Sequence, residues 1–101
     1  MKQLVLLFCV LLLAIFNQRS YGQNQTITGK VVASDEQVGL AGVTVQVKNT
    51  LRQTVTDNSG TFSIQAIPGE VLVFTFVGYV TKEVVVAGGG ERLTVALDVS
   101  S

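Results

Sequence analysis

The chain has 101 residues, of which seven are basic, seven are acidic and none is histidine. Without histidine it can form neither a Ser-His or Cys-His catalytic pair nor a histidine metal ligand, which excludes the commonest hydrolase and zinc-site chemistries. The basic residues are scattered along the chain rather than clustered, and this argues against nucleic acid as a partner.

The N-terminus has the layout of a secretory signal peptide. Lys2 precedes an uninterrupted apolar run over residues 4–16, and the polar stretch that follows contains a small-x-small cleavage pattern at Ser20 and Gly22. The alternative is a retained membrane anchor, but the apolar run is shorter than the roughly 20 residues that span a bilayer. We therefore predict a signal peptide at residues 1–22 and an exported domain at residues 23–101.

We expect the mature protein to begin at Gln23 in the periplasm, because cleavage after Gly22 makes Gln23 the new N-terminus. Cys9 would leave with the signal peptide, so the exported domain would contain no cysteine and would depend on core packing alone. Mass spectrometry of the exported protein tests this prediction. Membrane-embedded protein that still carries Met1 would contradict it.

Residues 23–101 show short stretches of alternating apolar and polar residues, separated by turn signals, and no helical periodicity. This pattern is typical of a β-sandwich. We predict a single all-β domain without a linker or an internal repeat. Its seven strands are expected at residues 26–33, 43–48, 52–56, 61–66, 70–77, 80–87 and 92–99.

The most informative stretch runs from residue 54 to residue 79. Residues 57–60 (Asp-Asn-Ser-Gly) predict a tight turn between two strands, because Asp and Asn side chains bond their own backbone and Gly accepts a positive φ. Pro68 and Gly69 predict the next turn. Every second residue of the flanking strands is apolar and is expected to enter the core: Phe62, Ile64, Ala66, Leu72, Phe74 and Phe76.

Two more strands are expected to supply opposite walls of the core, through Val43, Val45 and Val47 on one side and Leu93, Val95, Leu97 and Val99 on the other. The strand at residues 70–77 breaks the alternation, because Val71, Val73 and Val77 make its second face apolar too. One interpretation is a central strand that is covered on both sides or has a β-branched outer face. The other is a docking surface for another protein.

None of the polar clusters is predicted to be a catalytic, cofactor-binding or metal site. Asp35 and Glu36 are adjacent and are expected in a solvated turn, and residues 57–60 bring one carboxylate where calcium loops bring several. Residues 88–90 (Gly-Gly-Gly) lack the Lys-Ser/Thr of a phosphate loop and are predicted to form a hairpin turn. Tyr79 is expected to cap the edge of the core. Stacking of its ring on a sugar is the weaker alternative, because the chain has no tryptophan.

Four blocks of this sequence resemble the carboxypeptidase regulatory-like domain family: I-T-G-K-V-V at residues 27–32, G-V-T-V-Q-V-K at 42–48, T-D-x-x-G-x-F at 56–62 and F-x-F-x-G-Y at 74–79. The resemblance covers nearly all of residues 23–101 and implies a seven-stranded Greek-key sandwich of transthyretin-like (prealbumin-like) topology. Residues 39–42 read G-L-A-G where the family usually has P-L-P-G. This difference concerns the shape of one turn.

The resemblance also implies a function. In diderm bacteria such domains stand ahead of the plug and barrel of TonB-dependent outer-membrane receptors of the starch-utilisation type. The chain, whole or truncated, would then be a non-catalytic accessory domain of a nutrient-uptake receptor, in the periplasm or at the periplasmic face of the outer membrane. Its partner would be a protein of the outer-membrane transport machinery, with no cofactor and no nucleic acid.

Protein contacts could use either of two surfaces. One is the face around Val71, Val73, Thr75 and Val77, and the other is the unpaired backbone of an edge strand. A different function stays open: a self-standing secreted or periplasmic sandwich that binds a glycan or another protein.

Overall fold

The computed structural model describes residues 24–88 and 92–101, and the regular elements in these ranges are strands. In chain order they are β1 (Gln25–Ala33), β2 (Thr44–Val47), β3 (Gln53–Val55), β4 (Thr61–Ala66), β5 (Val71–Thr75), β6 (Lys82–Val85) and β7 (Arg92–Leu97). All seven predicted strands are present, and their ends differ from the predicted ends by two residues at most.

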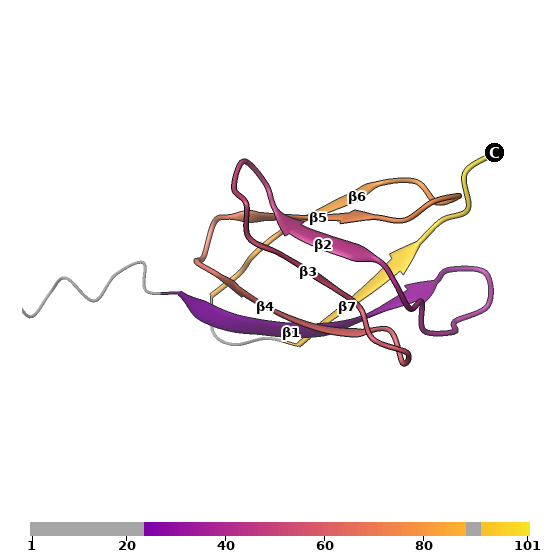
Figure 1. Cartoon of the computed structure of the whole chain (residues 1–101), viewed down its shortest axis with the longest axis horizontal. Helices are drawn as coiled ribbons and strands as arrows, with labels where there is room; N and C mark the ends of the chain where they lie inside the picture. The colour runs from indigo at the N-terminus through magenta and orange to yellow at the C-terminus, as the bar shows by residue number, and fades with distance from the viewer. Residues whose placement is uncertain (1–23, 89–91) are drawn as a thin grey trace, which may run out of the picture.

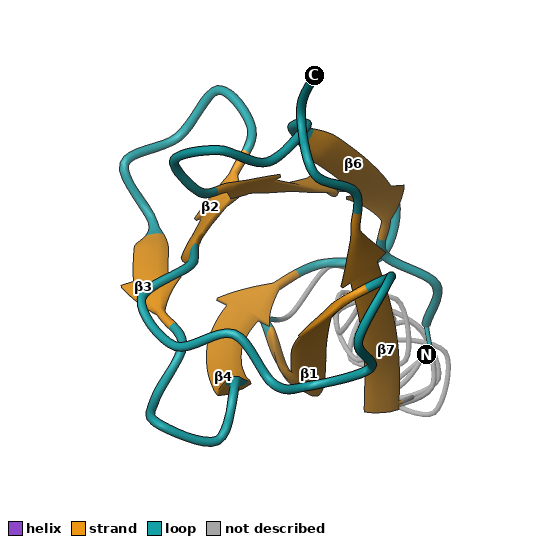
Figure 2. Ribbon diagram, turned by 90° about the vertical axis from the view of Figure 1, so that its right-hand side faces the viewer, coloured by secondary structure: helices purple, strands orange, loops and turns teal. Residues whose placement is uncertain are grey.

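The strands form two sheets that pack face to face (Figures 1 and 2). Sheet A contains β4, β1 and β7 in that order, and sheet B contains β3, β2, β5 and β6. In sheet A the central strand β1 is antiparallel to β4 and parallel to β7. All neighbours in sheet B are antiparallel. The predicted all-β, seven-stranded Greek-key sandwich is therefore confirmed.

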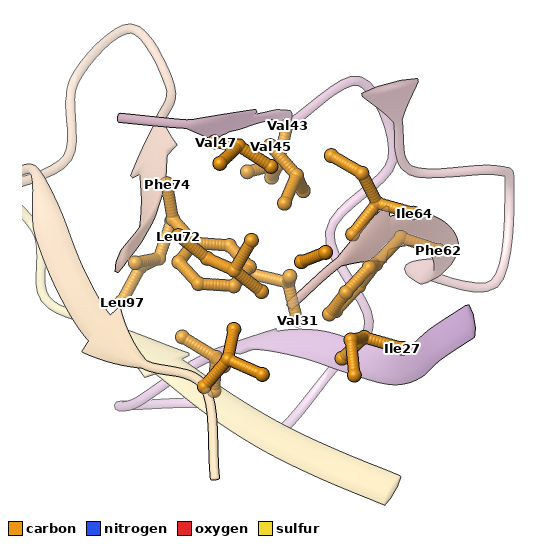
Figure 3. Close-up of a cluster of buried hydrophobic side chains, with 13 residues drawn as sticks. Ile27, Val31, Val43, Val45, Val47, Phe62, Ile64, Leu72, Phe74 and Leu97 are labelled. Atoms are coloured by element: carbon orange, nitrogen blue, oxygen red, sulfur yellow. The ribbon is translucent and has the colours of Figure 1, made fainter. Parts of the chain in front are cut away.

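The core lies between the two sheets (Figure 3). Phe74 of β5 is fully buried and meets Phe62 of β4 edge to face, with the ring centroids 5.5 Å apart. Because β5 belongs to sheet B and β4 to sheet A, this aromatic pair joins the two layers. The two predicted walls of the core are on opposite sheets. The remaining buried residues of the core cluster are Ile27, Val31, Val43, Val45, Val47, Ile64, Ala66, Leu72, Val86, Val95 and Leu97.

The predicted turn at residues 57–60 is present, but it carries the chain from β3 in sheet B to β4 in sheet A. The Asp57 carboxylate accepts hydrogen bonds from the hydroxyl and the amide of Thr61 (2.9 Å for the amide) and from the amide of Ser59 (3.0 Å). These donors, the Thr61 hydroxyl above all, lower the pKa of Asp57 below its ordinary value. The carboxylate is thus used to hold its own turn.

Three residues predicted for the core are not fully buried: Leu93 and Phe76 pack against its edge, and Val99 lies outside it. β5 ends at Thr75, so Phe76 follows the strand and is only half-buried. Val99 follows β7 and is 55% exposed, because the chain leaves sheet A there and forms an isolated bridge with Tyr79.

The hairpin turn predicted at residues 88–90 is also wrong, because β6 and β7 belong to different sheets. Residues 89–91 themselves lie outside the described ranges. So do Cys9 and the predicted signal peptide, which stays a prediction. Within residues 24–88 and 92–101, no helix is long and apolar enough to cross a membrane.

Candidate protein-contact surface

The carboxylates that were considered as chemical sites lie in turns. Asp35 and Glu36 are exposed in the turn after β1, as predicted, and Asp57 is bonded within its own turn. In the part of the chain that the structure describes, no three His, Cys, Asp or Glu side chains are placed to hold a metal ion. The exposed surfaces of the sandwich are the outer faces and the edges of the two sheets.

The outer face of sheet B is the first such surface. It consists of the residues that alternate with core positions: Thr44 and Gln46 on β2, Gln53 and Val55 on β3, Val71, Val73 and Thr75 on β5, and Glu83 and Val85 on β6. β5 lies between β2 and β6, as expected for a central strand with a β-branched outer face. Val71 and Val73 are only partly exposed.

An ion pair crosses this face above β5. Lys48 follows β2 and its amide donates to the carbonyl of Val71 (2.8 Å), whereas Glu83 lies on β6 opposite Val73. The Lys48 Nζ and Glu83 Oε1 atoms are 3.1 Å apart, so the two side chains meet over the strand between them. Both are about half exposed (48% and 47%), and such a pair contributes about 0.2–1 kcal/mol. Its main consequence is steric, because it occupies the space over Val71 and Val73.

The end of sheet B beyond β5 is apolar. Val77 is 93% exposed, and the half-buried rings of Phe76 and Tyr79 lie with centroids 5.7 Å apart. Tyr79 packs against the core edge, as predicted. Next to these residues is a shallow hollow of about 410 Å³ without a charged side chain in its lining, which consists of Gly42, Thr44, Thr75, Phe76, Val77 and Thr81.

The edges of the sheets are the second surface. β3 and β4 are the edges on one side of the sandwich, and β6 and β7 are the edges on the other (Figure 2). On the β3/β4 side, Arg52 donates to the carbonyl of Gln65 (3.2 Å) and pairs with Glu70. The amide of Ile67, followed by Arg52, lowers the pKa of Glu70. These contacts link sheet A to the strand ends of sheet B.

On the β6/β7 side the two sheets meet near the C-terminus. The amide of Val80 donates to the carbonyl of Asp98 (2.8 Å), and the amide of Ser100 donates to the carbonyl of Gly78 (2.9 Å). The Lys82 ammonium reaches the carbonyl of Ala96 (3.2 Å). The chain after β7 is therefore attached to the tip of sheet B, and its last residue lies at that end (Figure 1).

The apolar face around Val71 and Val73 was predicted from the sequence, but the ion pair that covers it was not. Lys48 and Glu83 are 35 positions apart, and they meet only because β5 pairs with both of their strands. The signal for this ion pair in the sequence is that Lys48 and Glu83 carry opposite charges. Without the strand order, neither residue could be matched to the other.

Comparison with known families matches residues 27–101 to the model of the CarboxypepD_reg-like domain. Two TonB-dependent receptors of Formosa agariphila are 36% identical over 76 residues and 42% identical over 74 residues, which is 74% and 73% of this chain. The TonB-dependent receptor SusC of Bacteroides thetaiotaomicron is 33% identical over 86 residues, or 85% of this chain. The chain spans only 7–8% of the length of these receptors.

Among solved structures, a chain from a type II cohesin–X–dockerin complex of Acetivibrio cellulolyticus is similar in fold. It superposes with a TM-score of 0.55 at 24% identity, covering 70% of this chain and 52% of the other. A second mutant of the same complex gives a TM-score of 0.52. At this level of identity the similarity concerns the fold alone.

Proposed function

The chain belongs to the CarboxypepD_reg-like domain family, and we propose that it acts as a non-catalytic accessory domain of a TonB-dependent outer-membrane nutrient-uptake receptor. The observation that supports this most strongly is the identity of 33–42% to TonB-dependent receptors over most of the chain. The predicted signal peptide is consistent with export to the periplasm. Fold alone would not support the assignment, because one sandwich serves many functions.

The domain would work through contacts with protein on the periplasmic side. Exposed valines favour sheet B for this role, because Val55 and Val85 lie on its outer face and Val77 and Val80 lie at its tip. Val55 and Val85 are on opposite edges of the sheet, whereas Val77 and Val80 lie together at its tip, where exposed apolar surface is typical of an interaction site. On the outer face of sheet A, by contrast, the exposed residues of β1 are Thr26, Thr28 and Lys30.

An exchange experiment tests the function. The segment of SusC that matches this chain is replaced by residues 24–101, and outer-membrane assembly and uptake of the receptor's substrate are measured. We expect both to be preserved, because the identity of 33% extends over 85% of this chain. The matched controls are SusC without the segment and SusC with an unrelated β-sandwich of similar size in its place, both of which should take up less substrate.

Two results would contradict the proposal. If SusC without the segment takes up substrate as fast as the parent, the domain has no role in uptake. If the unrelated sandwich works as well as residues 24–101, the domain acts only as a spacer and recognises no partner.

A further inference from the structure

We propose that the partner binds by strand addition: an extended segment of another protein pairs with the free edge of β6 and becomes the fifth strand of sheet B. This inference rests on the proposed function, since it specifies how the protein contact is made. The backbone hydrogen-bonding groups of the four edge strands are either bonded already or directed to the free side, and this decides which edge is open. An unpaired edge is a template for a further strand.

The β3/β4 side of the sandwich is partly closed. The backbone groups of Thr61, the first residue of β4, are already hydrogen-bonded. Its amide donates to the Asp57 carboxylate (2.9 Å), and its carbonyl accepts from the Asp57 amide (3.0 Å). At the other end of β4, the carbonyl of Gln65 accepts from Arg52. β3 has only three residues. An added strand on β4 would have to displace these contacts, and β3 offers a shorter edge than the four-residue β6.

The edge of β7 is partly closed. Its backbone groups alternate between β1 and the free side, and the carbonyl of Leu97 accepts from Ser34 of the β1 side (2.9 Å). Ala96 is therefore directed to the free side, where its carbonyl is bonded to Lys82. The carbonyl of Asp98, next on that side, accepts from Val80. Only the first half of β7 remains open.

The edge of β6 is open. The amide of Val86 donates to Glu70 (2.8 Å), which directs the backbone of Val86 toward β5. Because antiparallel ladders alternate, the backbone of Val84 also points to β5, and the groups of Glu83 and Val85 point away from it. Within the described residues β6 has β5 as its neighbour in the sheet, and no backbone group of a turn or loop bonds the amides or carbonyls of Glu83 and Val85. Together they present two donors and two acceptors in strand register.

The side chains beside this edge indicate what kind of strand would fit. Val84 on β6 and Leu93 on β7 face the core but are only partly buried, because both strands are edges on the same side of the sandwich. On the outer face, Val85 is 64% exposed. The added strand should therefore be apolar, with one side chain covering Val84 and Leu93 and the alternate one lying beside Val85.

A single strand suits this edge better than a second copy of the chain. One added strand needs about 4.8 Å of space beside β6. A second copy would bring a whole sandwich, with its own Lys82 contact, to a strand of four residues. Stable dimers bury about 1,200–2,000 Å² in total, which a contact between two such strands would not supply.

The test uses peptides as probes. A phage-displayed library of extended peptides, about eight residues long to exceed an average strand, is selected on the exported protein, and the enriched peptides are measured by fluorescence anisotropy. Val85→Pro removes the backbone N–H of residue 85, which points away from β5 and makes no hydrogen bond to it. Proline is tolerated on edge strands. We expect this change to weaken binding about tenfold, the loss of roughly one hydrogen bond.

Two matched variants separate the backbone from the side chains. Val85→Thr keeps the amide and the β-branched shape, and Thr44→Lys changes the outer face on β2, two strands away from the β6 edge. Both should bind the peptides as the wild type does. In the wild-type complex, hydrogen exchange should slow at the amides of Glu83 and Val85. This last measurement decides the question even if Val85→Pro does not fold.

Several results would overturn strand addition. Peptides that bind Val85→Pro as tightly as wild type, or that leave exchange at Glu83 and Val85 unchanged, bind elsewhere. Loss of binding in Thr44→Lys alone would place the contact on the outer face. Failure to enrich any peptide counts against the proposal. So does a wild-type dimer that Val85→Pro dissociates, because the β6 edge would then be paired with a second copy of the chain. The SusC exchange experiment uses no peptide. If the domain supports uptake in that experiment but binds no peptide at β6, strand addition is rejected and the proposed receptor function stands.

Discussion

Phe74→Ala should leave the domain largely unfolded under conditions in which the wild type is folded. Phe74 is fully buried in β5, contacts Phe62 across the two sheets, and is the largest fully buried side chain of the described residues. Truncating such a ring costs about 3–5 kcal/mol. A small domain without disulfides has a free energy of unfolding of about 5 kcal/mol, so little stability would remain. Circular dichroism and urea denaturation measure the change.

Phe76→Ala is the matched control. It removes the same ring two positions later, where β5 has ended and the side chain is half-buried against Tyr79. Its expected cost is about 1 kcal/mol, in proportion to the smaller apolar area lost. If Phe74→Ala melted within a few degrees of wild type, or if both variants were destabilised equally, the two-sheet core described here would be wrong.

The contrast between Phe74 and Phe76 shows what local sequence can predict. Alternation predicted both rings for the core, because F-T-F has the period of a strand. The period holds only while the strand lasts, and β5 ends at Thr75. Where a strand ends depends on its neighbours: β2 pairs with β5 as far as Thr75, and no pairing in the described residues extends to Phe76.

Turn chemistry predicted where the chain reverses but not which strands become neighbours. Residues 57–60 form the predicted turn, with Asp57 bonded to Ser59 and Thr61. A local signal of this kind is the same whether the flanking strands pair or belong to different sheets, and here they belong to different sheets. The hairpin expected at residues 88–90 was wrong for the same reason.

The contact surfaces depend even more on strand order. Val71 and Val73 could be recognised as apolar outer-face residues from the sequence, but their cover by Lys48 and Glu83 requires β2, β5 and β6 to be adjacent. Likewise, β6 is an open edge only because β7 joins sheet A and pairs with β1. The family resemblance supplied the fold and the class of protein. The choice between the outer face of sheet B and an edge strand as the proposed contact surface required the backbone hydrogen bonds of the structure.

Gly60→Ala should be strongly destabilising, although it adds a single methyl group. Gly60 has a φ of 84°, which costs an alanine about 1–2 kcal/mol. A Cβ atom there would also lie 2.6 Å from the carbonyl oxygen of Val31 and 2.8 Å from the amide nitrogen of Leu40, both backbone atoms that cannot rotate away. The Gly60 carbonyl accepts from the amide of Val31 (2.8 Å), so relief of the clash would break the contact between this turn and β1. Overpacking of this kind adds about 1–3 kcal/mol.

Gly69→Ala separates the two costs, because Gly69 has nearly the same φ (92°) but no atom within 4 Å of an added Cβ. It should show the conformational cost alone, about 1–2 kcal/mol, and remain folded. Urea denaturation of both variants gives the difference, which measures how tightly the 57–60 turn is held against β1 and residues 39–40. Equal destabilisation by the two substitutions would show that the turn does not dock on β1 as the structure describes. A larger loss in Gly60→Ala would show that this turn, which joins the two sheets, also fixes the loop that precedes β2.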